Sequence, residues 1–287
     1  MPGKRQLPTV RLRRLAGELR RLRAAADLTR EEVADRTGIN EATLYRLETG
    51  RARPQQRTLL SLLEAYSVPE AQREEIVALS KGADGQGWLR PYHSELSEQY
   101  SAYISFEAEA KAVRNYESSF IPGLLQTEDY ARAVIRGVLP QATSRDVEQR
   151  VQARMERQAV LEKSELLQLW AIVDEAALHR VVGGDKVMRE QLEHLQAMAS
   201  EPQVTLQVIP FRAGAHPGMP GSFVLMSFPD AADPEIVYTD SMAGEVFLEA
   251  EADVSRYGLI FDNLRAIAMS PADSRLLIAH TMHEETP

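Results

Sequence analysis

The stretch Thr29–Gly50, TREEVADRTGINEATLYRLETG, determines the expected fold of the N-terminal part of the chain. Thr29 and Glu32 have the spacing of a capping box, which predicts that a helix begins after Thr29. The same helix is expected to end at Gly38, because glycine adopts the positive φ common at helix C-termini. Asn40 is a good N-cap for a second short helix. The stretch therefore predicts two short helices joined by a tight turn.

Small and apolar residues occur where a helix-turn-helix needs them. In that motif the second helix lies in the major groove of DNA, and the first crosses the DNA backbone. The crossing requires a small residue in the first helix, a glycine in the turn and an apolar anchor in the second helix. Ala34, Gly38 and Leu44 meet these requirements. The joint occurrence predicts a DNA-binding helix-turn-helix.

Apolar periodicity on both sides of the motif predicts three further helices. In the first, from about Val10 to Ala26, one stripe is formed by Leu12, Leu15, Leu19 and Leu22. Two more helices are expected after Pro54 and after Pro69, and glycines at 82, 85 and 87 then indicate a linker. The sequence therefore predicts an all-α five-helix helix-turn-helix domain over residues 1–82.

Beyond the glycines, helical and strand patterns are mixed. Helical periodicity covers residues 94–116, 127–138, 144–161, 185–199, 250–267 and 271–279. Strand-like runs cover residues 167–173, 204–209, 222–228 and 235–239. We therefore expect a multidomain chain, with a linker and connecting helix over 83–119 and a mixed α+β effector or dimerisation domain over 120–287.

Charge is distributed unevenly along the chain. The 287 residues carry a formal net charge of -9, yet residues 1–57 contain 14 basic and 7 acidic residues, a net charge of +7. The rest of the chain has a net charge of -16. An acidic protein is repelled by phosphate, but a basic head on an acidic body is expected when only one end faces a polyanion.

Composition excludes several classes of site. The chain has no cysteine, which excludes disulfides and thiolate metal ligands, and its six histidines show no zinc-binding spacing. The longest apolar runs fall far below the roughly 18 residues of a membrane span, and residues 1–14 lack the apolar run of a secretory signal. We expect a cytoplasmic protein without enzymatic activity, cofactor or membrane partner.

The stretch Leu19–Gly50 resembles the Xre family, the Cro and lambda-repressor type of transcriptional regulator, nearly throughout. One departure is Arg30, where the family often has glutamine; arginine preserves a phosphate contact but not an inherited base contact. The resemblance implies that the residues facing the groove are Asn40, Glu41, Ala42, Thr43, Tyr45 and Arg46. Arg51 and Arg53, just past the second helix, are expected to contact phosphates.

Several of these residues have a second interpretation. Asn40 can read an adenine edge or cap the helix, and capping is the simpler role. Arg46 can contact a guanine or a phosphate. Glu41 can accept from a cytosine amine or interact with the helix dipole. For Glu48 we expect a structural ion pair rather than a DNA contact.

Three segments of the second domain resemble the effector domain of antitoxin-like regulators from high-GC filamentous bacteria. They are FIPGLLQTEDY (120–130), RMERQ (154–158), and IPFRAGAH (209–216) followed by GSF (221–223). The resemblance implies a small partner protein encoded nearby. The sequence thus predicts a homodimeric regulator that binds a double-stranded DNA operator and receives a small partner protein or ligand.

Other functions remain open at this point. The main role could be neutralising a small partner protein, the DNA-binding head could localise an enzyme, or the head could bind protein instead of DNA. We expect residues 120–126 to form a buried turn, of type II at Pro122-Gly123. Residues 216–221 suit a structural connection better than a ligand-binding loop. The acidic cluster Glu245, Glu249, Glu251 and Asp253 suits a helix start better than a cation site.

Overall fold

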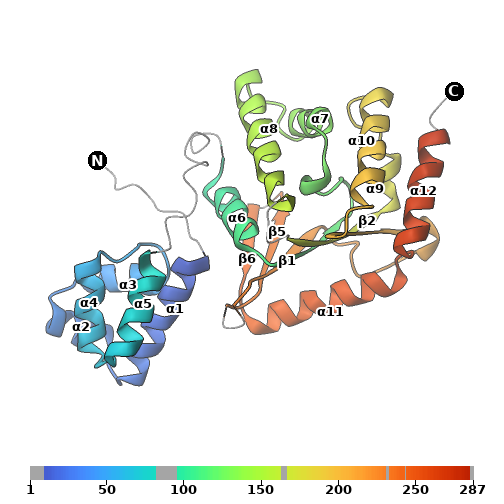
Figure 1. Ribbon diagram of the computed structural model, residues 1–287. Coiled ribbons are helices and arrows are strands. Elements are labelled where there is room, and N and C mark those ends of the chain that lie inside the picture. Colours follow the sequence, from blue (N-terminus) through green and yellow to red (C-terminus); the bar gives the residue numbers. More distant parts are fainter. Residues whose placement is uncertain (1–9, 82–95, 163–166, 231–232, 243, 285–287) are drawn as a thin grey trace. The chain divides into compact units, whose positions relative to one another are not determined.

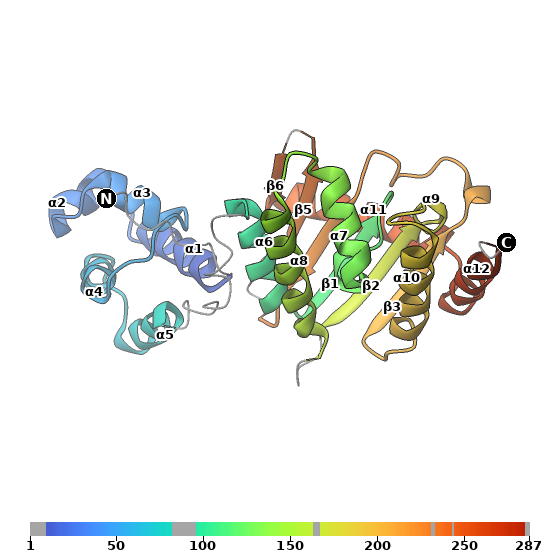
Figure 2. The same ribbon diagram turned by 90° about the horizontal axis from the view of Figure 1, so that it is seen from above.

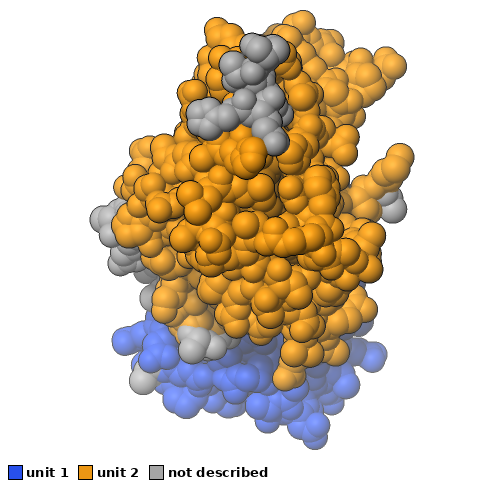
Figure 3. Space-filling model, turned by 90° about the vertical axis from the view of Figure 1, so that its right-hand side faces the viewer, with its two compact units in different colours: residues 1–91 blue, residues 92–287 orange. Residues whose placement is uncertain are grey.

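The structure, a computed structural model, describes residues 10–81, 96–162, 167–230, 233–242 and 244–284. The chain divides into two compact units, Met1–Pro91 and Tyr92–Pro287 (Figure 3). The glycines at 82, 85 and 87 that predict a linker lie outside the described residues. Within the described ranges, no helix has the length and apolar character needed to cross a membrane.

Helices α1 (Val10–Ala25), α2 (Arg30–Thr37), α3 (Glu41–Glu48), α4 (Gln56–Ala65) and α5 (Glu70–Lys81) build the first unit (Figure 1). Every helix contributes to one apolar core, with Leu19, Val33, Leu44, Leu62 and Ile76 as buried members from α1 to α5 in turn. Burying an aliphatic side chain of this size contributes roughly 1.5–3 kcal/mol. The five-helix fold predicted from the apolar periodicity is confirmed.

The second unit contains a mixed six-stranded sheet. Its strands are β1 (Ala112–Glu117), β2 (Gln168–Asp174), β3 (Val204–Ile209), β4 (Phe223–Ser227), β5 (Ile236–Ser241) and β6 (Gly244–Leu248), in the order β3-β2-β1-β4-β5-β6. β1 pairs parallel to β2, and β2 parallel to β3. β4, β5 and β6 continue from β1 in antiparallel pairs. The mixed α and β character predicted for this part of the chain is confirmed.

Helices cover both faces of the sheet. They are α6 (Glu98–Glu109), α7 (Glu128–Val138), α8 (Ser144–Gln158), α9 (Glu175–His179), α10 (Asp185–Met198), α11 (Glu251–Ile267) and α12 (Pro271–Glu284). α7, α8 and α10 lie over one face, and α11 runs along the other (Figures 1 and 2). On the α11 side, Phe261 and Leu264 pack with Tyr116 and Phe223 in a buried cluster.

Two strands differ from the sequence-based prediction. Helical periodicity predicts a helix over 94–116, but α6 ends at Glu109, and β1 lies between β2 and β4 in the sheet. Backbone partners on both sides stabilise this strand, so tertiary pairing overrides the local helical pattern. The second unit therefore begins before residue 120, the start that the sequence predicts. Residues 244–248 form β6, so Glu245 lies on a strand and α11 begins only at Glu251.

Candidate nucleic-acid interface

Caps fix the two helices of the motif at the predicted positions. The Glu32 backbone N–H donates to Thr29 Oγ1, and the Glu32 carboxylate accepts from the Thr29 backbone N–H at 2.8 Å, which completes the capping box. Gly38 has a φ of 71°, and its N–H donates to the Ala34 carbonyl. A left-handed residue lets the chain leave α2 sharply, and a side chain with a Cβ would be strained there.

α3 has one buried and one exposed face. Leu44 and Leu47 are buried in the core of the first unit. The residues predicted to face the groove are exposed, apart from the half-buried Thr43: Asn40, Glu41, Ala42, Tyr45 and Arg46. Burial of the leucine face fixes the rotation of the helix, so this set is presented together at one surface.

Two of these residues also stabilise α3 itself. Asn40 Oδ1 accepts a hydrogen bond from the Ala42 N–H at 2.8 Å, so its predicted capping role is confirmed. Arg46 Nη2 donates to Thr43 Oγ1 at 3.2 Å while its side chain stays exposed. An arginine guanidinium has five N–H donors, so this contact leaves others available for a guanine edge or a phosphate.

Glu48 anchors the last turn of α3 from the buried side. Its carboxylate accepts from Arg23 Nε at 2.6 Å and from Arg30 Nε at 2.8 Å, and its side chain is only 2% exposed. Arg23 also donates to the Leu28 carbonyl at 2.7 Å. The predicted ion-pair role of Glu48 is confirmed. The sequence does not predict the contact with Arg23, because Arg23 lies 25 residues from Glu48 and no local spacing links the two.

Arg30 belongs to the same network. Its guanidinium lies 5.5 Å from the ring centroid of Tyr45, and the Arg51 guanidinium lies at the same distance from that ring. Cations at such distances are attracted by the ring quadrupole. Arg30 thus positions Glu48 and Tyr45, and its direct phosphate contact stays a prediction. Arg51 is exposed beside Tyr45, where the predicted phosphate contact remains open to it.

Arg53 has a different place from the one expected. Its guanidinium donates to the Ser80 carbonyl in the last turn of α5. Carbonyls at a helix C-terminus lack partners within the helix and attract cations. Arg53 is also half-buried. Arg53 therefore has a partner within the first unit, and its phosphate contact stays a prediction.

In the second unit, side-chain amides hold the segment 120–127. The carbonyls of Ile121, Gly123 and Leu125 accept from Gln126, Gln158 and Gln191, at 2.7, 3.0 and 2.7 Å. Arg154 Nη1 in turn donates to the side-chain carbonyl of Gln126 at 2.9 Å. The predicted buried turn is confirmed, and Gln126, Arg154 and Gln158, which belong to the segments that carry the family resemblance, serve to hold it.

The turn type differs from the prediction. Residues Gly123–Leu125 form a single 3₁₀ turn, and Gly123 does not have the positive φ that a type II turn requires. Glycine is needed here for space, because a Cβ at this position would lie 2.5 Å from Arg157 Nη2.

Arg157 forms a buried ion pair between α8 and α6. Its Nε lies 2.7 Å from Glu107 Oε1, and both side chains are at most 4% exposed. Glu107 accepts from the Tyr103 hydroxyl at 2.7 Å, and Arg157 donates to the Tyr100 hydroxyl at 2.7 Å. Burial alone would lower the pKa of Arg157, but attraction by Glu107 raises it above its usual value. The cluster fastens α6, the first helix of the second unit, to the rest of that unit.

A half-buried carboxyl, that of Glu117, lies at the end of β1. Carboxyl ends of parallel strands are where open α/β sheets bind ligands. Burial raises the pKa of Glu117 to about 7, although hydrogen bonds from Ser222 and Asn115 act in the opposite direction. Glu117 can therefore change its protonation state near neutral pH.

The loop between β3 and β4 packs against the same edge. His216 Nε2 lies 3.2 Å from Asp174 Oδ2, and His216 Nδ1 accepts from the Gly218 N–H. A Cβ on Gly218 would lie 2.6 Å from the Tyr116 ring. Such close packing agrees with the predicted structural connection and gives no support to a ligand-binding loop at residues 216–221.

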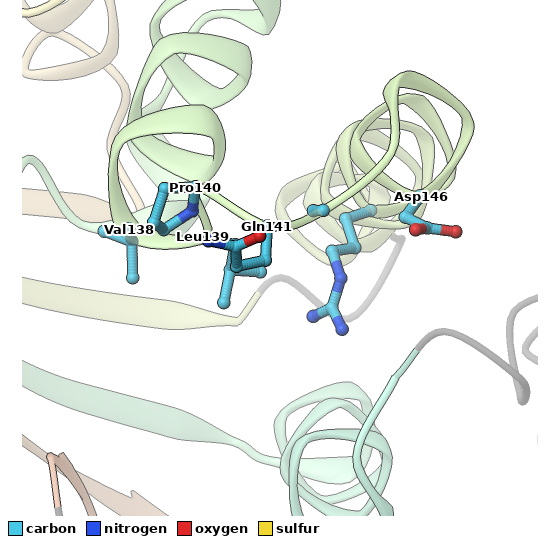
Figure 4. Close-up of a pocket in the computed structure, with 7 residues that line it drawn as sticks. Val138, Leu139, Pro140, Gln141 and Asp146 are labelled. Carbon is cyan, nitrogen blue, oxygen red and sulfur yellow. The ribbon is translucent and has the colours of Figure 1, made fainter.

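A hollow of about 500 Å³ lies at the turn between α7 and α8 (Figure 4). It is lined by Val138, Leu139, Pro140, Gln141, Ala142, Asp146 and Arg150. Ligand sites combine enclosed apolar walls with several convergent polar groups. Here the apolar Val138 and Leu139 are themselves exposed, so the hollow lacks such walls. Within the described ranges, no group of three or more His, Cys, Asp or Glu side chains is arranged to hold a metal ion. The acidic cluster at 245–253 therefore gives no support to a cation site.

Family models match both units. No curated protein and no solved structure matches the chain significantly. The family described as a helix-turn-helix domain matches residues 14–76, which makes the first unit a helix-turn-helix DNA-binding domain. The family described as "Domain of unknown function (DUF5753)" matches residues 100–280, which are more than half of the chain. The chain therefore belongs to the DUF5753 family and carries a helix-turn-helix domain ahead of the matched region.

Proposed function

We propose that the chain is a sequence-specific transcriptional regulator of the Xre type, which reads a double-stranded DNA operator through α3. The observation that carries this proposal is the division of α3 into a leucine face packed in the core and a polar face that is exposed. The net charge of +7 over residues 1–57 favours approach to a polyanion.

Roles within the interface follow from exposure. Arg46 has free donors for guanine O6 and N7, the commonest specific contact in the major groove. Arg51 contacts a phosphate beside Tyr45. Thr43 lies within one turn of Arg46 and Glu41 about 1.4 turns away, and both contact neighbouring bases. Arg23, Arg30 and Glu48 hold α3 in place through their ion pairs.

We also propose that the regulator acts as a homodimer whose second unit joins two heads and receives a small partner protein or ligand. One helix-turn-helix head buries a modest surface, and dimers bind two half-sites about one helical turn apart. Linking two heads makes the second contact intramolecular, with a gain of roughly 10² to 10⁴ in affinity when the geometry fits.

Affinity for DNA measured against salt concentration tests the proposal. The full-length chain is used to recover bound genomic fragments, and a recovered fragment is then titrated with the protein at several salt concentrations. With about four phosphate contacts, log affinity should fall against log salt with a slope of roughly -3.6. A slope near zero, or recovery of proteins without DNA, would refute the DNA-binding function and favour an interaction module.

A further inference from the structure

The two edges of the sheet in the second unit end differently. At the β3 edge, the Val208 carbonyl accepts from the Met269 N–H, and the Val208 N–H donates to Ser274 Oγ, both at 2.9 Å. Met269, between α11 and α12, and Ser274, in the first turn of α12, thus occupy this edge of β3. At the other edge, β6 pairs with β5, and within the part of the chain that the structure describes no backbone hydrogen bond reaches its outer side. An uncapped edge is a template for another strand.

Side chains of β6 divide between the two faces of the sheet. Phe247 lies edge-on to Phe106 of α6 at 5.2 Å, and Glu245 accepts from the Tyr238 hydroxyl at 3.0 Å. Val246 lies on the opposite face, because successive residues of a strand alternate. Val246 is 46% exposed, and within the described strands it is the only exposed large apolar side chain. The edge strand β6 therefore has an exposed apolar residue, Val246, between the anchored Glu245 and Phe247.

We propose that β6 pairs antiparallel with β6 of a second copy, about a two-fold axis through Val246. In an antiparallel pair, residues directly opposite each other share a face of the sheet. The two-fold axis must therefore lie between one residue and the same residue of the second copy. An axis at Glu245 would place two carboxylates opposite each other, which is destabilising. An axis at Phe247 would place Glu245 opposite the partner's Glu249.

Only an axis at Val246, among these three, avoids opposed carboxylates. In that register Val246 lies opposite the partner's Val246, and Glu245 lies opposite the partner's Phe247. Both exposed valines are then covered by each other. The sequence of the edge strand is thus complementary to itself in one register, which is what a two-fold interface requires.

The position of α6 connects this contact to the DNA-binding heads. Ser97, the N-cap of α6, donates a hydrogen bond to the Glu245 carboxylate, so the described part of the second unit begins beside the proposed axis. Residues 82–95 precede it, and 14 residues span at most about 46–50 Å when extended. Two heads attached near one axis can therefore reach half-sites about 34–36 Å apart. This use of the dimer rests on the proposed function; the pairing of the two strands does not.

Cysteine cross-linking tests the axis directly. The chain has no cysteine, so Val246→Cys provides one thiol per copy. In an antiparallel pair the Cα atoms of residues directly opposite lie about 4.5–5.5 Å apart, within the range of a disulfide. Mild oxidation of the full-length variant should give a cross-linked dimer. The control is Leu276→Cys, at an exposed position of α12, which should remain uncross-linked.

Charge substitutions test the register independently. Val246→Lys and Val246→Glu should each shift full-length protein from dimer to monomer in sedimentation, and mixing the two variants should restore a dimer. Leu276→Lys should leave the dimer unchanged. Monomeric wild-type protein, or a dimer that neither substitution weakens and that Val246→Cys does not cross-link, would overturn the proposal.

The failure of this inference can be told from failure of the proposed function. Wild-type protein that binds DNA as a monomer overturns the β6 pairing and leaves DNA recognition intact. A β6-dependent dimer without salt-dependent DNA affinity supports the pairing and overturns the DNA-binding function.

Discussion

Glu48→Gln tests whether the buried ion pairs hold α3 in place. The carboxylate faces Arg23 at 2.6 Å and Arg30 at 2.8 Å, and glutamine has nearly the same shape without the charge. The substitution therefore leaves two guanidinium groups without their counter-charge while it changes packing little. It should destabilise the motif selectively, because these contacts connect α3 to α1 and α2.

The size of the effect follows from exposure. Removing one partner from a fully buried ion pair costs about 3–5 kcal/mol, whereas an exposed pair contributes about 0–1 kcal/mol. Arg23 and Arg30 are 16% and 35% exposed, so both can recover part of their hydration. The amide oxygen of glutamine also retains one acceptor. We expect a loss of roughly 2–3 kcal/mol in the free energy of opening α2 and α3.

Amide hydrogen exchange in the full-length protein measures this loss segment by segment. Protection of α2 and α3 should fall, while protection of the sheet in the second unit stays unchanged. Glu64→Gln, which removes the same charge from an exposed position on α4, should change stability by at most about 0.5 kcal/mol. Equal protection in Glu48→Gln and Glu64→Gln would refute the anchoring role of Glu48.

Three further predictions concern the interface and the second unit. Arg46→Ala should weaken operator binding by roughly 1–3 kcal/mol and leave binding to random DNA nearly unchanged; Arg145→Ala, an exposed arginine of α8, is the control, and an equal loss on both DNAs would assign Arg46 to a phosphate. Because the pKa of Glu117 is raised to about 7, folding favours its protonated form, so the free energy of unfolding should fall by up to about 3 kcal/mol as pH rises from about 4.5 to 7. Glu117→Gln should remove that part of the pH dependence in denaturant titrations, and an unchanged profile contradicts the assignment. Gly123→Ala places a Cβ 2.5 Å from Arg157 Nη2 and should destabilise the second unit by about 1–3 kcal/mol, measured as a lower Tm; an unchanged Tm would show that the arginine moves freely.

Features encoded by neighbouring residues could be predicted from the sequence. The capping box at Thr29, the left-handed Gly38 and the Asn40 cap each depend on residues within a few positions, and the structure has all three. Apolar periodicity likewise gave the five helices of the first unit. Local spacing thus determines the motif and the exposed face of α3.

Features that depend on distant residues could not be predicted. Arg23 meets Glu48 only because α1 packs beside α3, and Arg53 finds the Ser80 carbonyl only after α5 has folded back. β1 resembles a helix in sequence, and its central place depends on β2 and β4, which come much later in the chain. Such contacts require the arrangement of whole elements, which single-sequence patterns do not specify.

The residues that carry the family resemblance in the second unit serve its packing more than any chemistry. Gln126, Arg154, Arg157 and Gln158, which carry much of that resemblance, are half-buried or buried, and each holds the turn at 120–127 or fastens α6. Residues so engaged cannot distinguish one partner or operator from another, because substituting them would disturb the fold itself. Specificity must therefore come from exposed positions that the fold tolerates in several forms. In the described chain, two surfaces have this character and also a clear physical use: the polar face of α3 and the free edge of β6. If both assignments hold, a change in pairing at β6 alters the spacing of the heads without touching the DNA surface, which is the coupling between two distinct sites that regulation requires.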